Sequence, residues 1–155
     1  MAAPRVKVAK AHTELVQKLM DTKASTGAFQ TYADIVIFAA AMGLRYGQKM
    51  PITEVATSEP APISLEVFIS RGYLWAINLI AIADSQDIDL LAADNSEAEA
   101  RRIQILEEYA NGGLAKLQTE LRGAVDYTER LLLILNSERF PVNSGEAEFD
   151  LSKFL

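Results

Sequence analysis

The chain has 155 residues, half of them hydrophobic, and carries a formal net charge of −6. A chain of this length is most simply one domain, and its apolar content is sufficient for a core. It has no cysteine and one histidine. This composition excludes disulfides, thiol chemistry and the usual kinds of zinc site, so we expect no cofactor and no metal.

The sequence gives no indication of a membrane segment. No apolar run reaches the roughly 18 residues that a membrane-spanning helix needs. Residues 1–7, Met-Ala-Ala-Pro-Arg-Val-Lys, lack the apolar stretch of a signal peptide. We therefore expect a cytoplasmic protein.

Charge is distributed unevenly along the chain. Residues 1–50 contain seven cations and three acids, a net charge of +4, so residues 51–155 carry −10. Chance variation between solvated faces is the preferred explanation, and the overall charge argues against a protein that coats nucleic acid. The alternative is a basic nucleic-acid-binding face. Its candidate residues are Arg5, Lys7, Lys10 and Lys18.

The first fifty residues predict a strand, a helix, a turn and a second helix. Residues 5–8 alternate charged and apolar side chains, as a half-buried strand does, and residues 9–20 form an amphipathic pattern. After a loop at 21–30, Thr31 and Asp34 predict a capped helix start, and Gly47 predicts its end. Because residues 35–44 are almost all apolar, we expect this helix to be central and buried from several sides.

The order strand, helix, helix is that of a ribbon-helix-helix module. In such a module two chains pair their strands, and the ribbon enters the major groove of DNA. Arg5 and Lys7 would be the outward side chains, and the protein would be a homodimer. The loop at 21–30 is long for this module, and a basic N-terminal segment without a ligand fits the sequence equally well.

The middle of the chain is less regular. Residues 48–62, with three prolines, predict a surface connection, while residues 63–69 suit either a strand or the short helix that we prefer. Residues 72–83 predict a second buried helix, with Trp75 in the core. Residues 84–95 are acidic, but they place isoleucine and aspartate where an EF-hand needs a ligand and glycine. We interpret them as a solvated loop.

The last third predicts three helices and a tail. Ser96 and Glu99 form the pattern of a capping box for a helix over 96–110, and Asn-Gly-Gly at 111–113 is typical of a helix end. Further helices are predicted at 114–121 and 126–135. In the tail, three apolar side chains suggest an anchor that docks into a groove, although a frayed terminus is the alternative. These side chains are Phe149, Leu151 and Phe154. The expected fold is mainly α, a compact bundle of five to six helices over residues 1–135, followed by a tail at 136–155.

The sequence shows no arrangement typical of an enzyme. It has no nucleophile elbow and no phosphate-binding glycine loop. Glu107 and Glu108 are adjacent and point to different helix faces. His12 lies near the start of an amphipathic pattern, where a surface position is expected. We predict a non-catalytic protein.

Several segments together resemble a known bacterial family. They are residues 31–34 (Thr-Tyr-Ala-Asp), residues 38–43 (Phe-Ala-Ala-Ala-Met-Gly) and residues 107–114 (Glu-Glu-Tyr-Ala-Asn-Gly-Gly-Leu), with residues 66–68, 72–73 and 77–83 in the same order between them. The family is DNA phosphorothioation-associated protein 4. The resemblance covers about residues 5–135 and leaves the tail outside.

The resemblance implies an accessory role beside a multi-protein complex that modifies DNA with phosphorothioate or restricts it. The expected partners are larger proteins of that complex, reached through protein–protein contacts, and DNA is the alternative partner. We interpret Tyr109 and Asn111 first as parts of a structural corner, because glycines permit positive φ and asparagine can bond the turning chain. A partner-binding surface at these residues is the second interpretation.

Overall fold

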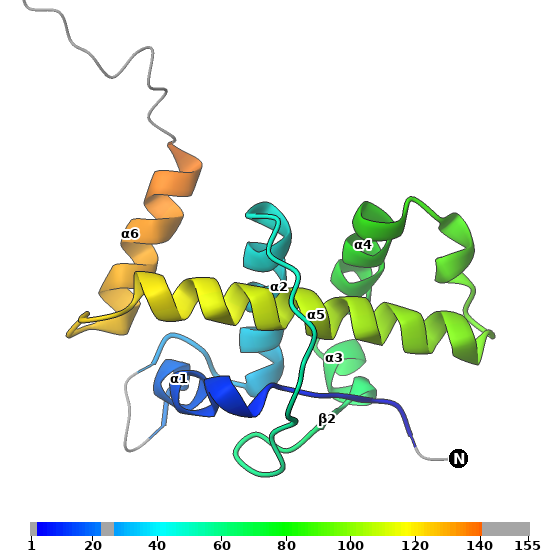
Figure 1. Cartoon of the computed structure of the whole chain (residues 1–155), viewed down its shortest axis with the longest axis horizontal. Helices are drawn as coiled ribbons and strands as arrows, with labels where there is room; N and C mark the ends of the chain where they lie inside the picture. The colour runs from blue at the N-terminus through cyan, green and yellow to red at the C-terminus, as the bar shows by residue number, and fades with distance from the viewer. Residues whose placement is uncertain (1–2, 23–26, 141–155) are drawn as a thin grey trace, which may run out of the picture.

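A computed structural model describes residues 3–22 and 27–140 (Figure 1). These ranges contain six α-helices, two short 3-10 helices and one two-stranded antiparallel sheet. The mainly helical fold expected from the sequence is confirmed. The anchor residues Phe149, Leu151 and Phe154 lie outside the described residues. The elements, in chain order, are β1 (Arg5–Val6), η1 (Lys10–His12), α1 (Thr13–Leu19), α2 (Tyr32–Arg45), β2 (Ile63–Ser64), α3 (Leu65–Ser70), α4 (Leu74–Ser85), η2 (Ile88–Leu91), α5 (Ser96–Glu120) and α6 (Tyr127–Arg139).

Helix α5 spans the molecule, and α2 crosses it near its middle (Figure 1). Three glycines lie at this crossing, and a Cβ atom added to any of them would lie 2.1 Å or less from a backbone oxygen of the neighbouring segment. These glycines are Gly43, Gly112 and Gly113. The predicted helix end at 111–113 is therefore wrong. The glycines allow two backbones to approach closely, and α5 continues through them.

The connection after α2 passes over α5 (Figure 1), and its bonds to Glu108 and Asn111 mark the place. Met50 donates its N–H to the carbonyl of Glu108 at 3.0 Å. The Asn111 side chain donates from Nδ2 to the carbonyls of Met50 and Pro51, each at 3.1 Å. α5 is thus held from one direction by α2 and from another by the connection, and both share the glycine-containing stretch.

The N-terminal segment is fastened to the same connection. β1 pairs with β2 in antiparallel register, with Arg5 opposite Ser64 and Val6 opposite Ile63. Further along, Ala56 donates its N–H to the carbonyl of Val8 at 2.8 Å. The predicted order of strand, helix and helix is confirmed. The strand pairs with β2 of its own chain, whereas a ribbon-helix-helix dimer pairs the strands of two chains.

Residues 63–69 combine both sequence interpretations. The first two residues form β2, and the helix α3 follows at once, with the Ser64 side chain accepting from the Glu66 N–H at 3.3 Å. The cap of α5 differs from the prediction by one residue, because Asn95 and not Ser96 accepts from the N–H groups of Glu97 and Ala98. The helix end at Gly47 is confirmed by its φ of 65°.

The exposure of two side chains is the reverse of the prediction. Trp75 was predicted to be in the core but is 67% exposed. α4 is apolar on all faces, so the sequence could not show that Ala76, Ile77 and Ile80 would face inward. His12 was predicted at the surface but is 7% exposed, with Nδ1 3.1 Å from Oε1 of Gln118 on α5. Burial lowers the pKa of His12, because desolvation disfavours the charged ring.

Candidate partner-binding surfaces

The four basic residues proposed for nucleic acid do not form one cluster. Arg5 lies on β1 and Lys18 on α1, and these elements stand at opposite ends of the N-terminal segment (Figure 1). The Arg5 guanidinium donates to the carbonyl of Pro62 at 3.2 Å. Lys10 and Lys18 pair at 3.2 Å with Glu54 and Glu14, which reduces the local positive charge. Contact between DNA and Arg5, Lys7, Lys10 or Lys18 stays a prediction.

Tyr109 and Asn111 point into the molecule. Tyr109 is 8% exposed, and its hydroxyl donates to Oδ1 of Asp84 at 2.7 Å. Burial, together with this carboxylate, raises the pKa of Tyr109 to about 12. Lys49 bonds Asp84 at 3.2 Å and lies 3.5 Å from Glu108, so the group ties α4, α5 and the connection together. The structural interpretation of these residues fits this burial, within a continuous helix instead of a corner.

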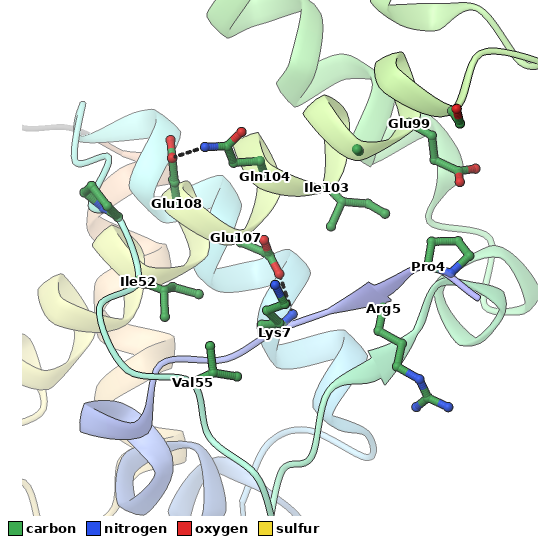
Figure 2. Close-up of a pocket in the computed structure, with 13 residues that line it drawn as sticks. Pro4, Arg5, Lys7, Ile52, Val55, Glu99, Ile103, Gln104, Glu107 and Glu108 are labelled. Atoms are coloured by element: carbon green, nitrogen blue, oxygen red, sulfur yellow. Dashed lines mark hydrogen bonds between the residues drawn. The ribbon is translucent and has the colours of Figure 1, made fainter. Parts of the chain in front are cut away.

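A groove of about 800 Å³ lies between β1, the connection and the first half of α5 (Figure 2). Three apolar side chains project into it: Ile52, Val55 and Ile103. Glu99 lies near Pro4 at one end, and Glu107 lies beside Lys7 farther along. The Arg5 guanidinium points away from α5. The groove thus combines an apolar lining with acidic side chains on the helix wall.

Glu107 connects the two walls of this groove. Its Oε2 accepts the backbone N–H of Lys7 at 2.6 Å. Burial raises the pKa of Glu107, and the hydrogen bond from Lys7 offsets part of this effect. Glu108 accepts from Gln104 at 3.1 Å on the same helix. Sequence reasoning missed this groove, because its walls are formed by segments about one hundred residues apart.

The outer face of α4 is apolar and exposed. Trp75 is 67% exposed and Leu79, one helical turn later, is 59% exposed. Residues 74–85 contain one ionisable residue, Asp84, and its carboxylate is occupied by Lys49 and Tyr109. Val67 and Ile69 on the neighbouring α3 are 38% and 40% exposed. This α4 face, defined by Trp75 and Leu79, therefore presents apolar area without charges.

Helix α6 exposes apolar side chains in a more charged setting. Leu132 and Leu133 are 62% and 56% exposed, while Leu131 and Ile134 are buried. The helix also carries four acidic or basic residues, Glu129, Arg130, Glu138 and Arg139. Their presence makes α6 a less apolar surface than α4.

The described part of the chain offers no group of three or more histidine, aspartate or glutamate side chains placed to hold a metal ion. Within the same residues, no helix is long and apolar enough to cross a membrane.

A family described as DNA sulphur modification system-associated protein 4 matches residues 5–154 of the chain. The chain belongs to this family. The match confirms the resemblance and extends it over residues 136–154, which the sequence comparison had left outside. Membership associates the chain with a DNA sulphur modification system. No curated protein and no solved structure matches the chain.

Proposed function

We propose that the chain is a non-catalytic adaptor that binds a larger protein of the DNA sulphur modification system through the α4 face. The observation that carries this proposal is the exposure of Trp75 and Leu79 on a helix whose only ionisable side chain is already paired. Membership in a family named for its association with that system supports the identity of the partner.

The chemistry of the α4 face suits a protein partner. Tryptophan is enriched among residues that contribute most to binding, and charged residues are depleted at the centres of interfaces. Residues four apart lie on one helix face, so Trp75 and Leu79 can enter the same complementary surface. Exposed apolar area of this kind costs free energy in water, and association with an apolar partner removes that cost.

A role based mainly on DNA contact has weaker support. The chain carries a net charge of −6, and Lys10 and Lys18 are paired with acids. One edge of β1 is taken by β2, and the Lys7 N–H on the other edge is bonded to Glu107 of α5. The adaptor therefore binds its specific partner, a protein, through protein–protein contacts. DNA binding is one of the results that the experiment can give.

The test is co-expression of the full chain with each other protein of the system, followed by size-exclusion chromatography with light scattering. The unmodified chain is expected to elute with one of these proteins, and the double variant Trp75→Ala/Leu79→Ala to elute alone. The control is Leu132→Ala/Leu133→Ala, which truncates two exposed apolar side chains of α6 and is expected to keep the complex.

Three results would contradict the proposal. The first is the absence of a complex with any protein of the system, and the second is a complex that the α4 variant forms equally well. The third is that the 17.0 kDa chain forms a dimer and the α4 variant is a monomer, because the α4 face would then bind a second copy. Duplex DNA is tested in parallel. Salt-sensitive binding that Lys7→Ala weakens would favour the DNA alternative.

A further inference from the structure

The groove beside α5 is bordered by one edge of β1. The Leu65 N–H donates to the Pro4 carbonyl at 3.0 Å, and Arg5 lies opposite Ser64. In an antiparallel ladder, alternate residues direct their N–H and C=O groups to opposite edges. Pro4 and Val6 therefore face β2, while Arg5 and Lys7 direct their backbone groups to the other edge, along the groove.

The hydrogen bond of Lys7 confirms this direction independently. Its N–H does not meet another strand but donates to the Glu107 carboxylate of α5 at 2.6 Å. A side-chain oxygen thus occupies the position that a carbonyl of a neighbouring strand would take. The backbone groups of Arg5 lie two residues earlier on the same edge, where the groove extends toward Glu99 (Figure 2).

We infer that the groove binds an extended peptide segment of a partner protein, which adds a third strand to β1 and alternates apolar with basic side chains. Addition of a strand to an open sheet edge is a common mode of peptide recognition, with main-chain hydrogen bonds supplying affinity and pockets supplying specificity. Here the Arg5 N–H and C=O provide the main-chain contacts.

The lining of the groove determines the chemistry of the peptide. Ile52 and Val55 on the connection and Ile103 on α5 form the apolar part of the lining, and they suit the apolar residues of an alternating strand. Glu99 and Glu107 line the helix wall, while Glu108 on the same wall is paired with Lys49. Lysine or arginine therefore fits the remaining positions better than acidic residues.

The dimensions are consistent with a short segment. The helix wall runs from Ser96 to Glu108, which is about 18 Å at 1.5 Å per residue. An extended chain advances about 3.3 Å per residue, so five or six residues match this length. A peptide that uses the full length displaces Glu107 from the Lys7 N–H, because this hydrogen bond joins the two walls. The inference concerns a surface separate from the α4 face and does not depend on the adaptor proposal.

The probe is a synthetic, fluorescently labelled peptide, Lys-Val-Lys-Val-Lys-Val, titrated with the full chain and followed by fluorescence anisotropy. Its matched control has the same sequence and charge, but carries N-methyl groups on alternate residues that remove the donors of one edge. A second control replaces lysine with glutamate. We expect saturable binding of the first peptide and at least tenfold weaker binding of both controls.

Arg5 offers a matched pair of protein variants. Arg5→Pro removes the N–H that faces the groove and leaves the bonds to β2 intact, because proline is tolerated where an edge N–H points away from the sheet. Arg5→Ala removes the same side chain but keeps the N–H. We expect Arg5→Pro to weaken binding at least fivefold relative to Arg5→Ala, with both variants folded by circular dichroism.

A second variant tests the acidic wall without altering the strand. Glu99→Lys is expected to weaken the binding of the lysine peptide at least fivefold. Glu97→Lys, on the same helix but outside the groove lining, is expected to leave this binding unchanged. Equal binding of the N-methylated peptide, or equal affinity of Arg5→Pro and Arg5→Ala, would overturn strand addition. Failure of every peptide to bind would do the same, and would leave the α4 proposal untouched.

Discussion

The backbone of Gly113 on α5 lies directly against the carbonyl of Ala39 on α2. A Cβ atom added at Gly113 would be 1.7 Å from that oxygen and 3.0 Å from the backbone nitrogen of Gly43. Neither atom belongs to a flexible side chain, so a larger residue can be accommodated only if the two helices separate. The close crossing of α2 and α5 therefore requires glycine, which has no Cβ atom, at this position.

Gly113→Ala is expected to destabilise the protein by about 3 kcal/mol, the upper end of the usual cost of overpacking a core. In an ordinary helix interior the same change stabilises by about 1 kcal/mol, because alanine is the better helix former. The sign of the effect therefore distinguishes a close crossing from a simple helix. Urea unfolding followed by circular dichroism measures it.

Gly47→Ala provides the comparison. No atom lies within 4 Å of a Cβ added there, and the cost comes from the φ of 65° alone. A left-handed conformation costs a non-glycine residue about 1–2 kcal/mol. If Gly113→Ala costs no more than Gly47→Ala, the close contact does not control packing.

Asn111 gives a second test of the α5 crossing. Its Nδ2 donates to two carbonyls of the connection, at Met50 and Pro51. Asn111→Asp keeps the shape but replaces the donor with an oxygen that faces both carbonyls. We expect a loss of about 3 kcal/mol or more at pH 7, because a buried charge that faces two carbonyl oxygens is costly.

Asn111→Ala is the appropriate control, since it removes the donor without adding a charge and is expected to cost about 1–3 kcal/mol. The aspartate variant should recover part of its stability at low pH, when its carboxyl is protonated and can donate. Equal stability of the two variants at pH 7 would contradict a stabilising role for the hydrogen bonds from Asn111 to Met50 and Pro51.

Local signals in the sequence identified local structure well. Thr31 and Asp34 form the predicted capping box, each accepting the backbone N–H of the other at 3.2 Å. The caps depend on residues three apart, so the sequence contains all the information that they require. The helix end at Gly47 is another feature of this kind.

Features that depend on a distant segment were not accessible in the same way. Asn-Gly-Gly at 111–113 has the composition of a helix end, but α2 lies against it and the glycines serve a crossing instead. The partner strand of Arg5 is at Ser64, and the acid that accepts the Lys7 N–H is at position 107. No local pattern records such pairings. Trp75 illustrates the limit for α4, where an apolar helix has no polar face to mark its outside.

Asp34 also joins the start of α2 to α3 and α4. Its two carboxylate oxygens each accept from Arg71 at 2.8 Å, and Tyr73 donates to one of them. Burial by itself raises the pKa of Asp34, but the hydrogen bonds from Tyr73, Arg71 and Thr31 outweigh it and leave this pKa below its usual value.

Asp34→Asn is therefore expected to cost about 1–2 kcal/mol at pH 7, discounted because Arg71 is partly exposed. A lowered folded-state pKa means that the stabilisation is fully present above the unfolded value of about 4. It is lost as the pH falls through the folded value.

The difference in stability between wild type and Asp34→Asn should therefore narrow below about pH 4, as thermal unfolding at several pH values would show. Asp94→Asn, at an exposed position, is the control. A difference that stays constant down to pH 2 would contradict the assignment.

Glu107 carries the opposite sign of pH dependence. Burial raises its pKa, and the Lys7 N–H compensates only in part. Because the folded-state pKa is higher than the unfolded one, the contribution of Glu107 is greatest below the usual value. It is lost as the pH rises through the folded value. Glu107→Gln does not titrate and keeps an oxygen that can accept from Lys7.

We therefore expect the stability of Glu107→Gln, measured relative to wild type, to increase from pH 4 to pH 7. Urea unfolding at pH 4, 5, 6 and 7 provides the measurement. Glu97→Gln, at an exposed position on the same helix, should show no such trend. A relative stability that falls with pH would mean that the ionised Glu107 and its hydrogen bond to Lys7 outweigh the cost of burial. In that case the carboxylate is stabilised where it stands, and a partner strand would have to displace a stabilised charge from the edge of β1.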